Sequence, residues 1–263
     1  MEPFETRSLR AQTPWGELAL QLRSAPHPGA ALILDGAFLM DSDAAESERR
    51  LAQRGLAVWE GRRAHQGPDV QEGSRSQPGC RVMVAGLGLG LTLRALLAQP
   101  GVARVDVVEL FPQVVAWNRR ELAELNGRAL ADARVSVHVG DLRGFLEAAR
   151  RGGRPAGLGA YYLVLLDIDN GPTWLSLPAN AWLYDPEGFA RLQAVLAPGG
   201  LVAYWATEPC PEFEALLEAR VAEDGGQSAW SRESVVYEPE GMDRTLGPGR
   251  RMESYLYFLE WRG

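Results

Sequence analysis

The chain contains no lysine, and all 27 of its basic residues are arginine. This absence excludes a lysine Schiff base and the lysine of a P-loop nucleotide site. Cysteine is scarce as well: Cys80 and Cys210 are too few for a disulfide framework or a cysteine-rich zinc site. The three histidines, His27, His65 and His138, lack the spacing of metal ligands, so no metal site is expected.

Long apolar runs are missing too. The longest apolar stretches fall well short of the roughly 20 residues that a membrane-spanning helix needs, so no membrane association is expected. The first residues, MEPFETRSLR, include acids and lack the apolar core of a secretory signal, which predicts a cytoplasmic protein. A formal net charge of −7 argues against nucleic acid as a partner and suits a cationic ligand better.

Turn-forming residues divide the first part of the chain. GELALQLR (16–23) and AALILDGAFLM (30–40) are strand-like runs joined by SAPHPG, which predicts a β-hairpin. Residues 41–61 begin with Ser and Asp, which can cap a helix, and continue with helix formers. Gly55 interrupts this run, so a short polar helix is expected. Residues 61–79 are dense in Gly, Pro, Gln, Ser and Arg and predict a linker or mobile loop.

From Cys80 onward, short apolar strands alternate with amphipathic helices. The expected strands cover residues 81–86, 104–110, 134–141, 161–169 and 200–207. This alternation is typical of right-handed βαβ units and a parallel sheet, so the fold class is α/β. Two further β-rich runs, ESVVYEP and ESYLYFLEWR, predict antiparallel strands at one edge. We expect a small β-hairpin domain over residues 1–60 and a larger domain over residues 80–263.

Glycine or acid follows four successive strands of this predicted sheet. The residues concerned are Gly86, Gly88 and Gly90 after the first strand, Glu109 at the end of the second, Asp141 at the end of the third, and Asp167, Asp169 and Asn170 after the fourth. Any one of them has an ordinary explanation, such as a tight turn or a helix cap. Ligands of open parallel sheets bind beyond the carboxyl ends of the strands, so the combination predicts a nucleoside site.

The order of these residues indicates which nucleoside ligand the site is expected to bind. The glycine turn reads GxGxG without a basic residue to serve a pyrophosphate, and Glu109 lies near the offset at which an acid binds ribose. Asp141 is placed to accept a hydrogen bond from an adenine amino group. We interpret this as a Rossmann-like site of the class I methyltransferase type, for S-adenosylmethionine or a close relative. A nicotinamide dinucleotide is the rival ligand.

Several segments resemble the spermidine synthase (polyamine aminopropyltransferase) family. They are RVMVAGLGLGLTLRALL, VDVVEL, VHVGD, YYLVLLDIDNGP, LYDPEGFARLQAVLAPGG and LVAYW, in order over about 130 residues, and LILDGAFLMDSD resembles the family's hairpin. The resemblance implies that decarboxylated S-adenosylmethionine or S-adenosylmethionine binds here, with Glu109 at the ribose, Asp141 at the adenine, and Leu110 and Leu142 beside them. It places Asp167 at the family's catalytic aspartate, which helps to deprotonate the attacking amine.

The sequence departs from that family at four places. Leu89 stands where the family's glycine turn carries an acid near the amino group of the donor, and Asn170 replaces a second acid of the strand-end motif. Met40 replaces a glutamine of the hairpin, and the family's Tyr-His-Glu has no clear match in ESERR. These changes indicate altered donor and acceptor recognition.

The acceptor side involves further residues. Asp169 or Asn170 is expected to anchor the acceptor, since carboxylates bind an ammonium group and accept its proton. Tyr184 and Trp174 are candidate contacts of the acceptor, whereas Trp205 is expected in the core. Glu46 and Glu48 could face the acceptor, although a solvated face of the helix is the preferred interpretation.

The predicted function is therefore the transfer of an alkyl group, most simply aminopropyl, from an adenosyl-sulfonium donor to a small-molecule amine. An S-adenosylmethionine-dependent methyltransferase acting on a small molecule is the first alternative. A nucleoside-binding protein without turnover is the second. A homodimer is expected from the resemblance alone.

Overall fold

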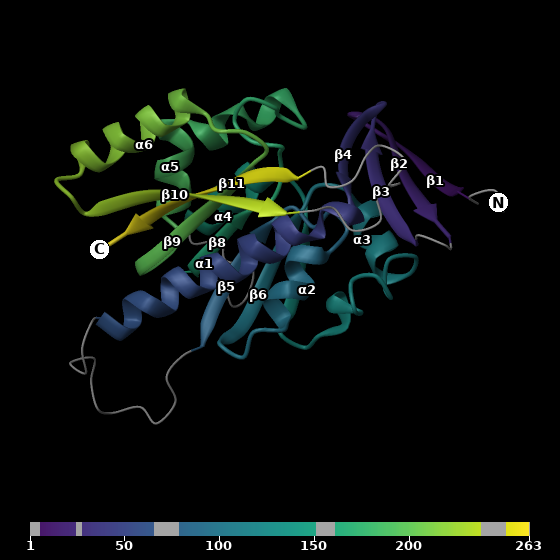
Figure 1. Cartoon of the computed structure of the whole chain (residues 1–263), viewed down its shortest axis with the longest axis horizontal. Coiled ribbons are helices and arrows are strands. Elements are labelled where there is room, and N and C mark those ends of the chain that lie inside the picture. The colour runs from purple at the N-terminus through teal and green to yellow at the C-terminus, as the bar shows by residue number, and fades with distance from the viewer. Residues whose placement is uncertain (1–5, 25–27, 66–78, 151–160, 238–250, 263) are drawn as a thin grey trace.

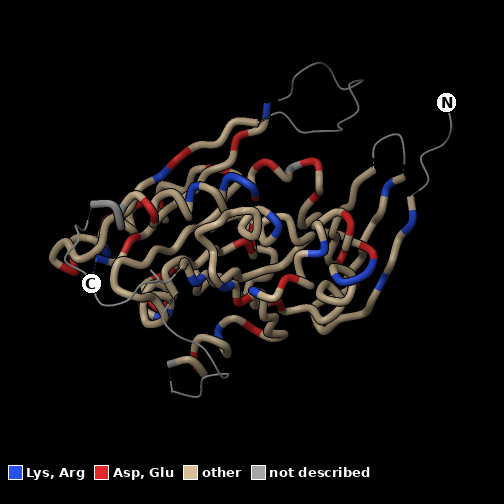
Figure 2. Tube along the Cα trace, turned by 90° about the horizontal axis from the view of Figure 1, so that it is seen from below, with Lys and Arg blue, Asp and Glu red and all other residues tan. Residues whose placement is uncertain are grey.

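A computed structural model describes the whole chain except residues 1–5, 25–27, 66–78, 151–160, 238–250 and 263 (Figure 1). It consists of a small antiparallel sheet and a larger mixed sheet covered by helices on both faces. Acidic and basic residues are interspersed along the traces of both parts (Figure 2). No helix among the described residues has the length and apolar character to cross a bilayer.

The small sheet has four strands in the order β1-β2-β3-β4, each antiparallel to its neighbour. The strands are β1 (Thr6–Thr13), β2 (Gly16–Arg23), β3 (Gly29–Leu34) and β4 (Ala37–Asp41). The predicted hairpin is present as β2 and β3. The expected run over residues 30–40 is, however, broken by a turn at Asp35 and Gly36, both with positive φ (48° and 79°), because such φ values end a strand.

Helix α1 (Ala45–His65) is longer than predicted. It follows the 3-10 turn η1 (Ser42–Ala44), continues through Gly55 and includes the first residues assigned to a linker; residues 66–78 of that linker lie outside the described residues. Gly55 does not end the helix. A Cβ there would lie 3.1 Å from a methyl carbon of Leu165, so glycine allows α1 to approach β8 closely.

One face of α1 is apolar. Leu51, Ala52, Leu56 and Trp59 are buried, and the helix packs on the large sheet at β8 and β9. The prediction of a short polar helix is therefore wrong, because the buried stripe was hidden among many charged residues. The division into domains at residues 60 and 80 stays a prediction.

The large sheet has seven strands in the order β10-β11-β9-β8-β5-β6-β7. They are β5 (Cys80–Ala85), β6 (Val102–Glu109), β7 (Val135–Val139), β8 (Tyr161–Leu166), β9 (Leu196–Ala206), β10 (Ser228–Tyr237) and β11 (Met252–Trp261). Strands β5 to β9 are parallel to one another, and β11 pairs antiparallel with both β9 and β10, so the predicted antiparallel strands lie at one edge. The α/β class is confirmed, and the strand order reverses between β5 and β8, where such folds bind ligands.

Helices cover both faces of this sheet (Figure 1). They are α1, α2 (Leu91–Leu97) and α3 (Pro112–Arg119) on one face, and α4 (Leu142–Arg150), α5 (Pro186–Gln193) and α6 (Pro211–Glu223) on the other. Short 3-10 turns η2 (Ala129–Ala131) and η3 (Pro178–Tyr184) complete the connections. Neighbouring residues of β5 alternate between the two cores, with Val82 and Val84 on the first and Met83 and Ala85 on the second.

Candidate functional site

A cavity of about 400 Å³ lies at the carboxyl ends of the central strands. Its wall includes most of the residues predicted for the site, namely Gly86, Gly88, Glu109, Leu110, Asp141, Leu142, Asp167, Asp169, Asn170 and Trp174. Strand β4, the start of α1, the segment between β8 and α5 and the first residues of β11 also contribute to the wall. The small sheet and the large sheet thus enclose the site together.

All three glycines have positive φ, and two of them line the cavity. Gly86 has φ 89°, and a Cβ there would lie 2.1 Å from the carbonyl oxygen of Asp167, so glycine lets the turn pass the end of β8. Gly88 has φ 50° and packs against the sulfur of Met40. Gly90 is the N-cap of α2 and packs against Asn118, outside the cavity wall. The third predicted cofactor contact is therefore a helix cap in this structure.

Glu109 fixes the glycine turn to the end of β6. The backbone N–H groups of Leu87 and Phe111 donate to its two carboxylate oxygens at 2.8 and 2.7 Å. Burial raises the pKa of Glu109, and these backbone donors oppose that shift. The carboxylate therefore has a fixed position in the cavity wall, as a ribose-binding acid requires.

Asp141 caps the next helix. Its carboxylate accepts the N–H of Gly144 at 3.1 Å, and the residue is exposed at the rim of the cavity. Leu142 is buried beside it in the same wall. Both the cap and the predicted adenine contact are compatible with this position.

Asp167 directly follows β8, lines the cavity and is half-buried. Thr92 in the first turn of α2 donates its hydroxyl to Asp167 at 2.7 Å. Desolvation raises the pKa of Asp167 to about 6, and the Thr92 bond opposes the shift. A carboxylate with a pKa near neutrality is well suited to accept a proton.

Asp169 is buried and bonded on several sides. It accepts the N–H of Ser176 at 2.7 Å, the amide of Asn180 at 2.9 Å and the hydroxyl of Tyr184 at 3.3 Å. Burial raises its pKa against these bonds. Asp169 therefore organises the loop between β8 and α5.

The three remaining acceptor-side predictions differ in outcome. Asn170 and Trp174 line the cavity, and Trp174 is 54% exposed at its rim. Tyr184 is absent from the cavity wall among the described residues, because its hydroxyl is turned to Asp169 and its ring packs on Tyr204 and Phe213. Its predicted role as a direct substrate contact is not what this position indicates: Tyr184 supports Asp169 from behind.

Glu48 lies in the cavity wall and not on the solvated helical face predicted for it. It is 5% exposed and lines the cavity, with the Ser47 hydroxyl donating to it at 2.7 Å. Burial and the charge of Asp167 raise its pKa to about 8. Trp205, expected in the core, also reaches the cavity wall.

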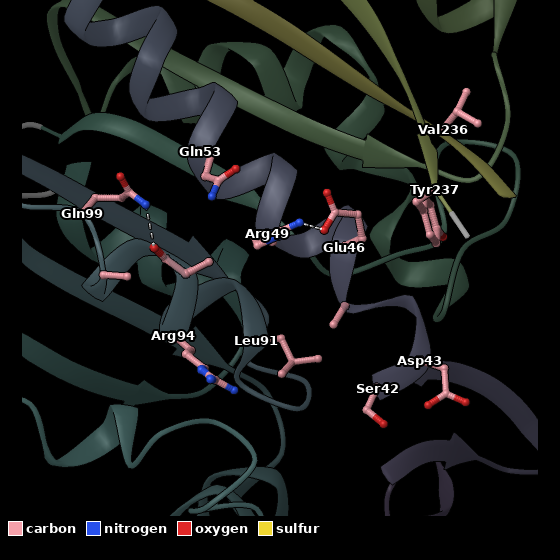
Figure 3. Close-up of a pocket in the computed structure, with 13 residues that line it drawn as sticks. Ser42, Asp43, Glu46, Arg49, Gln53, Leu91, Arg94, Gln99, Val236 and Tyr237 are labelled. Atoms are coloured by element: carbon pink, nitrogen blue, oxygen red, sulfur yellow. Dashed lines mark hydrogen bonds and ion pairs between the residues drawn. The ribbon is translucent and has the colours of Figure 1, made fainter. Parts of the chain in front are cut away.

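Glu46 lies in different surroundings although it is two residues away. It pairs with Arg49 and Arg50 beside an open hollow of about 590 Å³ between α1 and α2, shown in Figure 3. The solvated helical face predicted for both acids is correct for Glu46 and wrong for Glu48. Residues two apart point to different sides of a helix, so the pattern left open which acid would face inward.

The order of strands, the glycine turn and the acids around the cavity together define a domain with the class I methyltransferase-like fold. The model of the spermine/spermidine synthase domain matches residues 21–235, and the chain belongs to that family.

Individual relatives are longer than this chain. It is 37% identical over 142 residues to a polyamine aminopropyltransferase of Mycobacterium tuberculosis, a match covering 54% of this chain and 24% of the relative. It is 35% identical over 175 residues to polyamine aminopropyltransferase 2 of Streptomyces coelicolor, covering 65% of this chain and 29% of that protein. The matched region is thus under a third of each relative.

Solved structures show the same fold. A spermidine synthase in complex with the transition-state analogue AdoDATO superimposes with a TM-score of 0.61 over 97% of this chain and 72% of that one, at 15% identity. The spermidine synthase from Thermotoga maritima gives a TM-score of 0.62 over the same shares, also at 15% identity.

Proposed function

We propose that the protein transfers an aminopropyl group from decarboxylated S-adenosylmethionine to a small-molecule amine. The amine nitrogen attacks the aminopropyl carbon bound to sulfur, and the carbon–sulfur bond breaks with its electrons moving to sulfur. Methylthioadenosine leaves, and the proton lost by the amine passes to Asp167. The observation that carries this proposal is the position of Asp167 in the cavity wall, where desolvation raises its pKa toward neutrality.

The glycine turn supports a donor without a carboxylate. The N–H of Leu89 donates to the sulfur of Met40 at 3.2 Å, and that of Leu87 donates to Glu109 at 2.8 Å. The N–H groups of Gly86 and Gly90 are bonded to backbone carbonyl groups, and that of Gly88 faces Glu109. A carboxylate on the donor would need such N–H groups, and in this turn they already have acceptors.

Relatives and structural neighbours point to the same chemistry. The M. tuberculosis relative is named a polyamine aminopropyltransferase, and one neighbour binds a transition-state analogue of spermidine synthase. Extending these activities to this chain is part of our proposal, since the match covers 24% of that relative's length. The homodimer and the cytoplasmic location stay predictions.

Product analysis tests the proposal. Each donor, with or without its carboxylate, would be incubated with the protein and a panel of mono-, di- and polyamines, and the nucleoside products measured by mass spectrometry. We expect amine-dependent methylthioadenosine from the decarboxylated donor. Asp167→Asn should lower its rate by about 100-fold or more while donor binding persists, and Glu46→Gln should match the wild type.

Two outcomes would contradict the proposal. Adenosylhomocysteine formed from S-adenosylmethionine would identify a methyltransferase, the function favoured by the loss of the acid at Leu89. Tight donor binding without any product would identify a nucleoside-binding protein.

A further inference from the structure

Glu48 and Asp167 reach the same cavity from segments far apart in the sequence. Glu48 lies in the first turn of α1, and Asp167 directly follows β8. The charge of Asp167 acts on Glu48, so the two carboxyl groups are near each other. Neither the residue types nor their spacing in the sequence predicts that these two acids lie near each other.

The protein supplies these two acids with neutral partners. Ser47 donates a hydroxyl to Glu48 and Thr92 donates one to Asp167, each at 2.7 Å. Each carboxylate has room for several hydrogen bonds, so both retain unused acceptor capacity toward the cavity.

Nearby arginines are already paired with other acids. Arg23 is bonded to both oxygens of Asp41, at 2.6 and 2.7 Å, and also to Asp43. Arg49 and Arg50 are bonded to Glu46. Within the part of the chain that the structure describes, no salt bridge reaches Glu48 or Asp167. A buried acid beside a half-buried one is costly for the fold without a cation, and a positively charged ligand would offset that cost.

We propose that Glu48 and Asp167 together hold the reacting ammonium group of the acceptor, with Glu48 binding the cation and Asp167 taking its proton. This inference rests on the proposed aminopropyl transfer and adds a second recognition acid to it. Much of the described wall around the pair is aliphatic, including Leu34, Met40 and Ile168. The acceptor class that fits is a primary amine on an aliphatic chain.

The proton balance follows from the charges around Glu48. Asp167 and Asp41 face it from the ends of β8 and β4, Arg23 neutralises Asp41, and Glu253 lies in the cavity wall at β11. Burial, with the charge of Asp167 added, raises the pKa of Glu48 to about 8, so the pair holds about one proton at neutral pH, and an arriving ammonium displaces it. During transfer the amine gives one proton to the pair, which releases it to solvent with the products.

Steady-state kinetics test this assignment. Initial rates of methylthioadenosine formation would be measured at saturating decarboxylated donor with varied 1,4-diaminobutane, from pH 6 to 9. We expect Glu48→Gln to raise the KM for the amine about tenfold or more while the KM for the donor changes less than about twofold. Glu48→Asp, which keeps the charge, should recover part of the amine affinity, and Glu46→Gln is the matched control on the same helix. The inference is overturned if Glu48→Gln changes both KM values alike or neither.

A binding measurement separates this inference from the proposed function. If the wild type forms no product, the proposed function fails, and calorimetric titration of 1,4-diaminobutane into protein saturated with methylthioadenosine then decides the inference. Weaker amine binding by Glu48→Gln than by Glu46→Gln supports the pair as an ammonium site. Equal binding by the two variants overturns it.

Discussion

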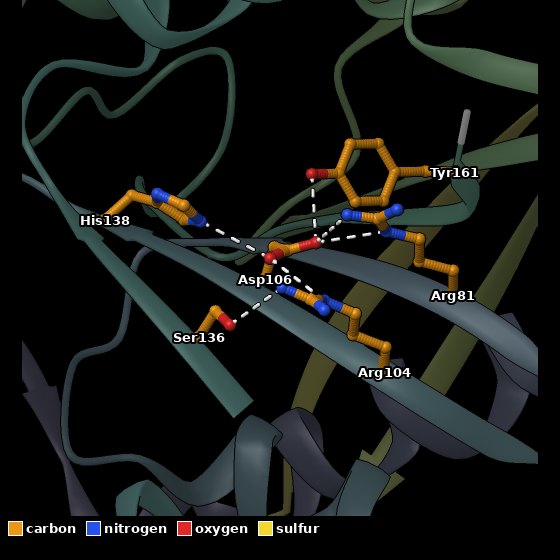
Figure 4. Close-up of polar contacts among 6 residues, drawn as sticks. All are labelled: Arg81, Arg104, Asp106, Ser136, His138 and Tyr161. Atoms are coloured by element: carbon orange, nitrogen blue, oxygen red, sulfur yellow. Dashed lines mark hydrogen bonds and ion pairs between the residues drawn. The ribbon is translucent and has the colours of Figure 1, made fainter. Parts of the chain in front are cut away.

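Acids are withdrawn from solvent in two regions of the molecule, and the two regions differ in whether the acids have positively charged partners. Asp106 in the middle of β6 is 1% exposed and surrounded by partners from three other strands (Figure 4). Arg81 lies 2.8 Å away and Arg104 3.6 Å away, while Tyr161 and His138 contact the carboxylate at 3.2 and 3.3 Å. The cavity pair Glu48 and Asp167 has one hydroxyl donor for each acid.

The difference in partners distinguishes an acid that stabilises the fold from acids that we propose bind a ligand. At Asp106 the chain itself provides the positive charge that a buried carboxylate needs. At the cavity no salt bridge among the described residues reaches the two acids, and burial raises the pKa of both. Carboxylates in a cavity with raised pKa values and spare acceptor capacity are typical of functional sites.

The largest effect on stability is expected at Asp106. Asp106→Asn should lower the free energy of unfolding by about 3 kcal/mol, because Arg81 and Arg104 lose the charge that they share. Urea unfolding followed by tryptophan fluorescence measures this change. The half-exposed pair of Asp132 and Arg134 provides the control, since Asp132→Asn should cost less than about 1 kcal/mol. An Asp106 variant as stable as the wild type would break the contrast between the two regions.

Asp169 is an intermediate case, buried among neutral donors. Asp169→Asn should lower the free energy of unfolding by about 2 kcal/mol, because the side-chain amide would face the N–H groups of Ser176 and Asn180. Its effect on the KM for the amine should be smaller than that of Glu48→Gln. If stability is unchanged while amine binding is lost, Asp169 is the acceptor anchor that the sequence suggested.

The smallest effect has the opposite sign. The pKa of Glu48 is higher in the folded protein than its ordinary value of 4.5, so its contribution to stability is full below about pH 4.5 and declines as pH rises through about 8. Glu48→Gln should therefore gain stability relative to the wild type as the pH is raised from 5 to 8.5. Urea unfolding at the two pH values measures this. A variant less stable than the wild type at pH 8.5 would mean that Glu48 serves the fold.

Strand ends were the most informative part of the sequence. Glu109, Asp141 and Asp167 were predicted to meet because the carboxyl ends of parallel strands share one edge of a sheet, and all three line the cavity. The roles assigned to them stay predictions. Gly90 lies outside the cavity wall, and the Tyr184 side chain faces away from the cavity, since position along the chain does not determine the direction of a side chain.

Other elements could not be read from local patterns. Strand β1, TRSLRAQT, is mostly polar and is held by pairing with β2, so its sequence alone carries a weak strand signal. Helix α6 was not predicted, although Pro211 begins it and Glu212 and Glu214 lie in its first turn. The inward position of Glu48 depends on the packing of α1 against β8 and β9, a contact between distant segments.

In our proposal, Glu48 and Asp167 hold a proton in place of the cation that the ligand supplies. Titration calorimetry of 1,4-diaminobutane into protein saturated with methylthioadenosine, repeated at pH 7 in buffers of different ionisation enthalpy, counts the protons exchanged on binding. We expect the wild type to release about one proton per amine bound and Glu48→Gln to release close to none. Amine binding to the wild type without proton release would contradict the account.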